Sequence, residues 1–217
     1  KPAKGPQEGY GFAADQGIHR WSVSMARKLE KNNLTEPENR EIYEYGLEQM
    51  IVYTLNIVTT CVIGWVLGLF WESLFFSRAF IFMRHSNGGA HAANNLRCYV
   101  LSTLAVLSCL MVSQWAVSAA LSKYLIFTAI LPSSITVFLF SPVEDYNKPI
   151  SERERIHHRD RGITTLSGCM IACIVCLMYG LLSFGCVIGS AIIITSITMV
   201  IGLVKNRFYD WQMEHMK

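Results

Sequence analysis

Five long apolar runs constrain this chain more than any other feature of its sequence. Each run is close to twenty residues long and contains no Asp, Glu, Lys or Arg. A helix needs about 20 apolar residues to cross a bilayer. The runs are 49–70, 99–117, 124–141, 163–182 and 184–204. The sequence therefore predicts an all-α integral membrane protein with five long transmembrane helices.

A sixth apolar segment, 73–83, differs from these five because it is short and carries Arg78 in its middle. About eleven residues cannot span a bilayer comfortably, so we expect a short or re-entrant helix that neighbouring helices bury. The chain opens with polar residues and its first long apolar run starts late, so no cleavable signal peptide is expected.

The segment 18–32, IHRWSVSMARKLEKN, has an amphipathic pattern. Its apolar residues on one side of a helix are Ile18, Trp21, Met25 and Leu29. Arg and Lys lie opposite them, which is typical of a helix in the membrane interface, although a helix packed on the protein's own cytoplasmic face has the same pattern. Residues 1–17 contain Gly and Pro without periodicity and are interpreted as a tail, separate from one membrane-embedded domain at 18–217.

The distribution of Lys and Arg predicts which polar segments share a side of the membrane. Basic residues are frequent in the N-terminal arm, in 142–162 and at the C-terminal end, whereas 118–123 and the turn near Ser183 are nearly free of them. Loops rich in Lys and Arg stay on the cytoplasmic side. The arrangement is consistent if 73–83 returns the chain, and it then places both termini, 84–97 and 142–162 on the cytoplasmic side.

The polar stretch 83–100, MRHSNGGAHAANNLRCYV, separates two apolar runs and allows two interpretations. In one it is a solvated turn in which His91 and Cys98 have no role. In the other His91 takes the proton of Cys98 and produces a thiolate nucleophile. On one straight helix the two residues would be about 10 Å apart along the axis, whereas a base must approach within roughly 3 Å. We therefore predict a bend before Leu96, with Cys98 in the first turns of the next helix.

Neighbouring residues could support such a site. Two cations, Arg84 and Arg97, favour a thiolate electrostatically. Candidates for stabilising an oxyanion are the backbone amides of Gly88 and Gly89 and the side chains of Asn94 and Asn95. Glu72 and the two asparagines are candidates for orienting His91, while His85 is interpreted as a bystander.

The basic segment 142–162 also has two interpretations. It is either a solvated connector beside anionic lipid headgroups or a binding region for an acidic peptide. Its substrate-binding candidates are Arg153, Arg155, Arg159 and Arg161. Six of the seven cysteines lie in apolar runs, where cysteine usually acts as a small hydrophobic residue. We expect no metal, no cofactor and no nucleic-acid partner.

Five residues of the polar stretch form a motif with a family resemblance. They are Arg84, Gly88, Gly89, His91 and Cys98, in the spacing R-x-x-x-G-G-x-H-x-x-x-x-x-x-C. This motif resembles the AgrB (accessory gene regulator protein B) family over roughly 18–210, and SPVEDYNKP at 141–149 resembles its proline-containing cytoplasmic loop. The resemblance implies a bacterial membrane cysteine endopeptidase that matures an AgrD-type quorum-sensing propeptide. Cys98 would be the nucleophile and His91 the base, with Arg84 and Gly89 as further important positions.

The resemblance also implies a reaction sequence. Cys98 would form a thioester with the propeptide, release its C-terminal part and support closure of a thiolactone or lactone ring. The implied partners are this propeptide and the lipid bilayer. A homodimer with a second copy of the chain is a further expectation. The alternative function is a small membrane transporter or channel in which 73–83 and the polar stretch form a re-entrant gate, with Pro132 in a mobile span.

Overall fold

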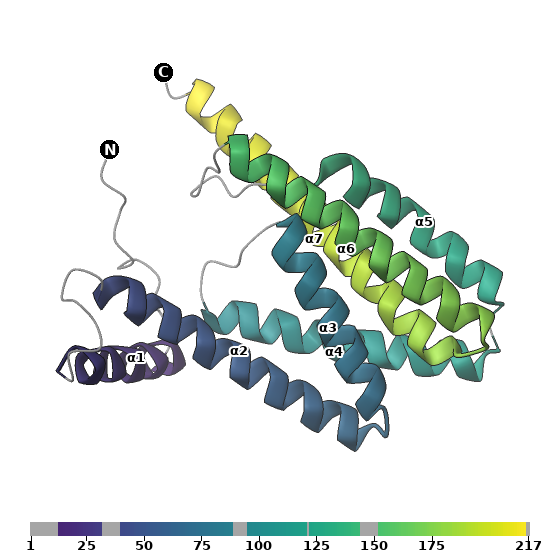
Figure 1. The fold of residues 1–217 in the computed structure, drawn as a ribbon, viewed down its shortest axis with the longest axis horizontal. Helices are drawn as coiled ribbons and strands as arrows, with labels where there is room; N and C mark the ends of the chain where they lie inside the picture. Colours follow the sequence, from purple (N-terminus) through teal and green to yellow (C-terminus); the bar gives the residue numbers. More distant parts are fainter. Residues whose placement is uncertain (1–12, 32–39, 89–94, 121, 144–151, 216–217) are drawn as a thin grey trace. The chain divides into compact units, whose positions relative to one another are not determined.

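The computed structural model describes residues 13–31, 40–88, 95–120, 122–143 and 152–215. These residues form helices without any strand, as the sequence predicted (Figure 1). The helices are α1 (Ala13–Lys31), α2 (Arg40–Val66), α3 (Phe70–Asn87), α4 (Asn95–Ser118), α5 (Lys123–Phe140), α6 (Glu152–Met178) and α7 (Leu182–His215). The prediction of an all-α membrane protein is confirmed.

Five helices are long and apolar enough to cross a membrane, so the chain is a multi-pass membrane protein. The spans are Tyr43–Val66, Leu96–Ser118, Lys123–Phe140, Arg155–Met178 and Leu182–Phe208. Each overlaps a predicted run, but several helices continue into charged sequence because backbone hydrogen bonding does not stop where the apolar run ends. Large apolar side chains such as Trp65 and Val66 are 78% and 75% exposed, as expected of surfaces that face lipid.

The expectation of a short helix at 73–83 is wrong in its bounds. α3 has 18 residues, Phe70–Asn87, and is therefore about 27 Å long, close to the roughly 30 Å of a bilayer core. α3 packs against α6 and α7 and buries Ser73, Phe76 and Met83 completely. These neighbours let polar residues extend the helix beyond its apolar segment. Arg78 is exposed, with its guanidinium 5.1 Å from the centre of the Phe82 ring.

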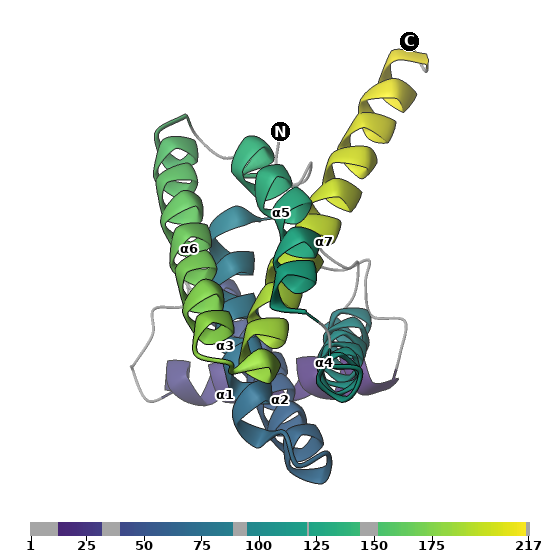
Figure 2. The same ribbon diagram turned by 90° about the vertical axis from the view of Figure 1, so that its right-hand side faces the viewer.

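The structure divides into two compact units, and the division passes through α2 and α4. The first unit comprises 1–59 and 92–104, and the second comprises 60–91 and 105–217. In the second unit α7 contacts α3, α5 and α6, and Figure 2 shows the C-terminal turns of α7 extending beyond α5 and α6. The core between these helices includes Met83, Val137, Leu166, Ile192 and Met199.

In the second unit, polar contacts gather near the two ends of α3. At one end Ser183 Oγ donates to Glu72 Oε1 (3.0 Å), and Ser113 Oγ donates to the Ser183 carbonyl (3.2 Å). The end of α3, the end of α5 and the N-terminal half of α6 meet at the other end, through the contacts of Asn87 described below. The stretches after α3 and after α5 therefore leave from the same end.

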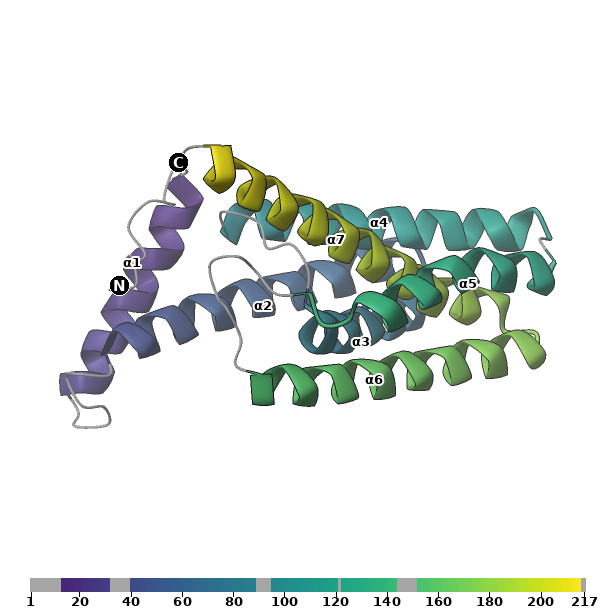
Figure 3. The same ribbon diagram turned by 90° about the horizontal axis from the view of Figure 1, so that it is seen from above.

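In the first unit α1 crosses the beginning of α2 (Figure 3). His19 Nδ1 lies 2.6 Å from Glu48 Oε1, and Ser22 Oγ donates to the same oxygen at 3.4 Å. Trp21 points away from this contact and is 70% exposed. A helix that makes polar contacts on one side and exposes its tryptophan on the other favours the membrane-interface interpretation. α1 begins at Ala13, four residues before the predicted end of the tail at residue 17.

Candidate active site

Cys98 lies where the sequence predicted, in the first turns of a helix. α4 begins at Asn95, so Cys98 is its fourth residue, and its side chain is exposed. The carbonyl of Cys98 accepts a hydrogen bond from Ser102 Oγ (2.8 Å), which leaves the thiol uninvolved in that contact. The positive end of the α4 dipole lies at this end of the helix.

α2 supplies the neighbours of Cys98 within the first unit. Thr59 Oγ1 and Tyr99 Oη are 2.7 Å apart and join α2 to the start of α4. The Tyr53 hydroxyl lies within range of a Coulombic interaction with the Cys98 thiol. Sequence reasoning missed Tyr53 because a tyrosine in an apolar run carries no signal of its own. Only the register of α2 against α4 brings it towards the thiol.

The last residue of α3, Asn87, is completely buried and holds together three segments of the second unit. Its side-chain Nδ2 donates to the Met83 carbonyl (2.8 Å), and its Oδ1 accepts from Ser141 Oγ (2.7 Å). Its own carbonyl accepts from the Val143 backbone N–H (3.0 Å). We call Asn87, Ser141, Val143 and Gly162 the Asn87 junction.

Gly162 of α6 closes the Asn87 junction from the third side. A Cβ atom at this position would lie 2.5 Å from Asn87 Oδ1 and 2.6 Å from Ser141 Oγ, so a side chain does not fit. One turn away, Ser86 Oγ and Thr165 Oγ1 are 3.2 Å apart and add a second polar link between α3 and α6. The junction therefore requires glycine at 162 for packing.

Gly88 follows Asn87 in a backbone conformation that only glycine adopts readily, with φ 70° and ψ −143°. It pairs with Val143 in an isolated parallel bridge, and a Cβ on Gly88 would overlap the Val143 carbonyl oxygen. The Gly88 N–H donates to the Arg84 carbonyl (3.1 Å) and closes the last turn of α3. The first glycine of the motif thus ends a helix and docks the chain on the segment after α5.

The remaining predicted site residues have different outcomes. Arg84 lies in the last turn of α3, with its guanidinium Nη1 buried. Gly89, His91 and Asn94 lie outside the described residues, so the pairing of His91 with Cys98 stays a prediction. Asn95 is the first residue of α4. Glu72 lies about 24 Å along α3 from Gly88 and accepts from Ser183, which argues against a role in orienting His91.

The arginines of the predicted 142–162 loop belong to a helix. α6 begins at Glu152, so Arg153, Arg155, Arg159 and Arg161 all lie in its first three turns. Arg155, Arg159 and Arg161 are exposed. Sequence reasoning assigned them to a loop because charged residues interrupt the apolar pattern, whereas the helix simply continues out of the apolar span.

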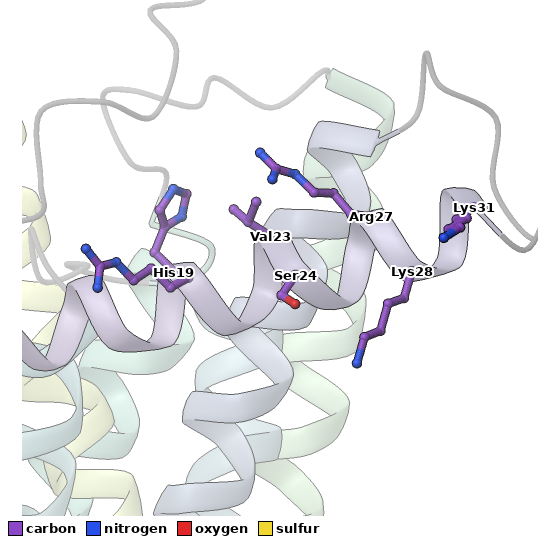
Figure 4. A pocket seen from close by; sticks show the side chains of 7 residues that line it. His19, Val23, Ser24, Arg27, Lys28 and Lys31 are labelled. Atoms are coloured by element: carbon purple, nitrogen blue, oxygen red, sulfur yellow. The ribbon is translucent and has the colours of Figure 1, made fainter.

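A second basic surface lies on α1. An open concavity of about 500 Å³ is lined by His19, Arg20, Val23, Ser24, Arg27, Lys28 and Lys31. In Figure 4 the side chains of Arg27 and Lys28 leave α1 in different directions, with Val23 and Ser24 between Arg27 and His19. This arrangement presents positive charge over about three turns of the helix.

The cysteines other than Cys98 are packed among apolar helices. Cys109, Cys173 and Cys186 are buried, and Cys173 Sγ lies 3.4 Å from the Gly185 carbonyl oxygen. Within the described ranges no group of three His, Cys, Asp or Glu residues could hold a metal ion.

Comparison with known proteins decides the family. The model of the family described as Accessory gene regulator B matches residues 22–205, most of the chain. The chain belongs to the accessory gene regulator B family. This membership implies a role in accessory gene regulator quorum sensing. The matched residues include Cys98 in α4 and all residues of the Asn87 junction. No solved structure matches the chain.

The curated relatives are distant. The chain is 24% identical to an AgrB-like protein of Clostridium perfringens over 67% of its own length and 70% of that protein's. It is 25% identical to accessory gene regulator protein B of Staphylococcus saprophyticus over 61% of its length and 68% of the relative's. The match with an AgrB-like protein of Halalkalibacterium halodurans is 28% identical but spans 40% of this chain and 44% of that protein.

Proposed function

We propose that this protein is a membrane cysteine endopeptidase that cleaves an AgrD-type quorum-sensing propeptide through a thioester on Cys98. The observation that carries the proposal is the position of Cys98, exposed in the first turns of α4 inside the region matched to the family. All seven cysteines fall within the described residues, and Cys98 alone among them is exposed. A thiol must be accessible to attack a peptide carbonyl, and the helix N-terminus favours its reactive form.

The chemistry needs two side chains. His91 accepts the proton of Cys98, and the Sγ atom bonds to the scissile carbonyl carbon. The carbon–nitrogen bond then breaks, His91 returns the proton to the leaving amine, and the N-terminal part of the propeptide remains as a thioester. A thiol or hydroxyl within that peptide attacks the thioester carbonyl, which closes the ring, and its proton returns to Cys98. Each bond that forms replaces one that breaks, so these two acyl-transfer steps need no cofactor.

Water is the competitor in the second step. Exchange of a thioester for a thiolactone is nearly neutral in free energy, whereas hydrolysis is strongly downhill, so the enzyme must keep water from the acyl group. A site beside membrane-spanning helices supports this requirement. We place the site on the cytoplasmic side because the segments after α3 and α5 leave from one end, and basic residues are frequent in 142–162.

We propose that basic side chains near the start of α6 bind the acidic tail of the propeptide. Arg155, Arg159 and Arg161 are exposed and present three guanidinium groups, and Arg153 lies in the first turn of the same helix. Guanidinium groups bind carboxylates through paired hydrogen bonds. Replacing all four by Gln is expected to raise KM for the propeptide at least tenfold with little change in kcat. An unchanged KM in the folded variant would leave these residues as a lipid-facing surface.

The decisive experiment is co-expression of a tagged AgrD-type propeptide with wild type, Cys98→Ala, His91→Ala and Cys61→Ala. Cys61 is half-buried in α2 and serves as the matched cysteine control. We expect cleavage by wild type and Cys61→Ala and none by Cys98→Ala or His91→Ala. A covalent peptide adduct that hydroxylamine removes should map to Cys98 by mass spectrometry.

The outcome also separates the two classes of function. A transporter or channel predicts an uncleaved propeptide with all four proteins. Cleavage that persists in Cys98→Ala contradicts the thioester mechanism, because no other cysteine of the described chain is exposed.

A further inference from the structure

We propose that the basic face of α1 binds the phosphate headgroups of anionic phospholipids. The basic face comprises four exposed side chains of this helix: Arg20, Arg27, Lys28 and Lys31. All four belong to the first unit, and their role does not depend on the chemistry of Cys98. Anionic phospholipids are thus a partner of the chain in addition to the propeptide.

α1 joins α2 at the level where the bilayer begins. His19 and Ser22 of α1 both contact Glu48 Oε1. Glu48 is the last charged residue before the apolar run 49–70 and lies within the span Tyr43–Val66. α1 crosses α2 at this point (Figure 3), so it lies across the start of a membrane span instead of extending it. An amphipathic helix in this position lies in the headgroup region of the membrane.

α1 packs through small side chains and exposes its large apolar ones. Ser22 and Ala26 are 0% and 1% exposed, whereas Trp21 and Met25 are 70% and 44% exposed. Lys28 follows Met25 by three residues and Trp21 by seven, so these three side chains lie on one side of the helix. At a membrane surface a Trp ring lies between headgroups and acyl chains, while a neighbouring Lys keeps its charge at the phosphates. This side of α1 is therefore suited to a lipid leaflet.

The other cations of the basic face continue around the helix from Lys28. Figure 4 shows Lys28 on one side of α1 and Arg27 on the other. Within the described part of the chain, none of the four basic side chains forms a salt bridge with an acidic side chain. Glu30 follows Ala26 by four residues and therefore lies on the packed side of the helix. Positive charge thus extends about 17 Å along α1 and suits a partner that carries several anionic groups.

Two kinds of partner carry several anionic groups, an acidic peptide and a phospholipid leaflet, and the surroundings of the basic face favour the leaflet. The open concavity of about 500 Å³ beside these cations is lined by residues of α1 alone, so no second element of the described chain forms a groove for a peptide there. A leaflet also covers Trp21 and Met25, which a peptide bound to the cations would leave exposed. Clusters of Lys and Arg beside a membrane span attract anionic headgroups.

The experiment measures which lipid contacts Trp21. The full-length protein is reconstituted in vesicles of phosphatidylcholine with a fixed, minor fraction of phosphatidylglycerol, and the same amount of bromine is placed on the acyl chains of one lipid or the other. Bromine quenches a tryptophan that it contacts, so the quenching that Trp21→Phe removes belongs to Trp21, although the chain has five tryptophans. We expect phosphatidylglycerol to associate with this site about fivefold more strongly than phosphatidylcholine. Salt at about 1 M should abolish the preference, because it screens charges beyond about 3 Å.

Two variants separate the charge of α1 from its position. When all four side chains of the basic face are replaced by Gln, quenching of Trp21 should no longer depend on the headgroup. His19, Ser22 and Glu48 are retained in this variant, so the contact of α1 with α2 is preserved. The matched control, Arg20→Lys with Arg27→Lys, keeps four positive charges and should keep the preference within about twofold of wild type. The salt dependence of wild type carries the test if the Gln variant does not fold.

Four results would overturn the lipid role of the basic face. They are equal quenching of Trp21 by the two brominated lipids in wild type, no quenching of Trp21 by either lipid, a preference that persists at high salt, and a folded Gln variant that keeps the preference. Hexaglutamate serves as an acidic peptide probe and should leave the preference unchanged at equal ionic strength. If micromolar hexaglutamate removes the preference, the basic face binds an acidic peptide, and the lipid role is refuted.

Discussion

Replacing Gly162 by Ala should destabilise the protein, although alanine is normally the better residue in a helix. The added Cβ would lie 2.5 Å from Asn87 Oδ1 and 2.6 Å from Ser141 Oγ, and both side chains are fixed by their mutual hydrogen bond. Overpacking costs about 1–3 kcal/mol, and separating a buried hydrogen-bonded pair costs about 1–3 kcal/mol more. The gain from replacing a helical glycine is about 0.5–1 kcal/mol. We expect a net loss of about 1–5 kcal/mol in the free energy of unfolding.

Gly168→Ala provides the matched control, because Gly168 lies in the same helix and a Cβ there would meet nothing within 4 Å. This variant should gain about 0.5–1 kcal/mol. Reversible unfolding in mixed micelles of SDS and neutral detergent, followed by tryptophan fluorescence, measures both. If Gly162→Ala is as stable as Gly168→Ala, the Asn87 junction is not close-packed and the argument from it is refuted.

Three further changes test other parts of the fold. Gly88→Ala should lower the unfolding free energy by about 1–3 kcal/mol in the same titration, because its backbone conformation and the Val143 carbonyl exclude a side chain; wild-type stability would contradict this geometry. Gly189→Ala should lower the free energy of unfolding by about 1–3 kcal/mol, because the added Cβ would overlap the Ile130 Cδ1 atom. Ile130→Val, introduced into the same variant, should recover part of this loss. If the free-energy changes of the two substitutions are additive, the contact is disproved. Glu48→Ala should release α1, because it removes the oxygen that contacts His19 and Ser22 of that helix, and tryptic cleavage within α1 should accelerate. An unchanged rate would show that other contacts hold the helix.

Part of the candidate site could be predicted because it depends on neighbours in the sequence. Gly88, His91 and Cys98 lie within eleven residues of one another in the sequence. A bend was predicted before Leu96, and Cys98 was therefore expected in the first turns of the following helix, where the structure has it. Tyr53 and Asn87 gave no such signal. Ser141 lies 54 residues from Asn87, and its hydrogen bond exists only because the ends of α3 and α5 meet.

The sequence by itself determined the membrane class, the five spans and the sharing of one end by two polar segments, because these follow from uninterrupted apolar length and from the positions of charges. The tertiary structure decided how far α3 extends, since Thr165 of α6 and Ser141 after α5 provide partners for the polar side chains of Ser86 and Asn87 at its end. It also decided that Gly162 must lack a side chain. That requirement comes from the close approach of α6 to the ends of α3 and α5, and the order of residues along the chain does not reveal such a distance.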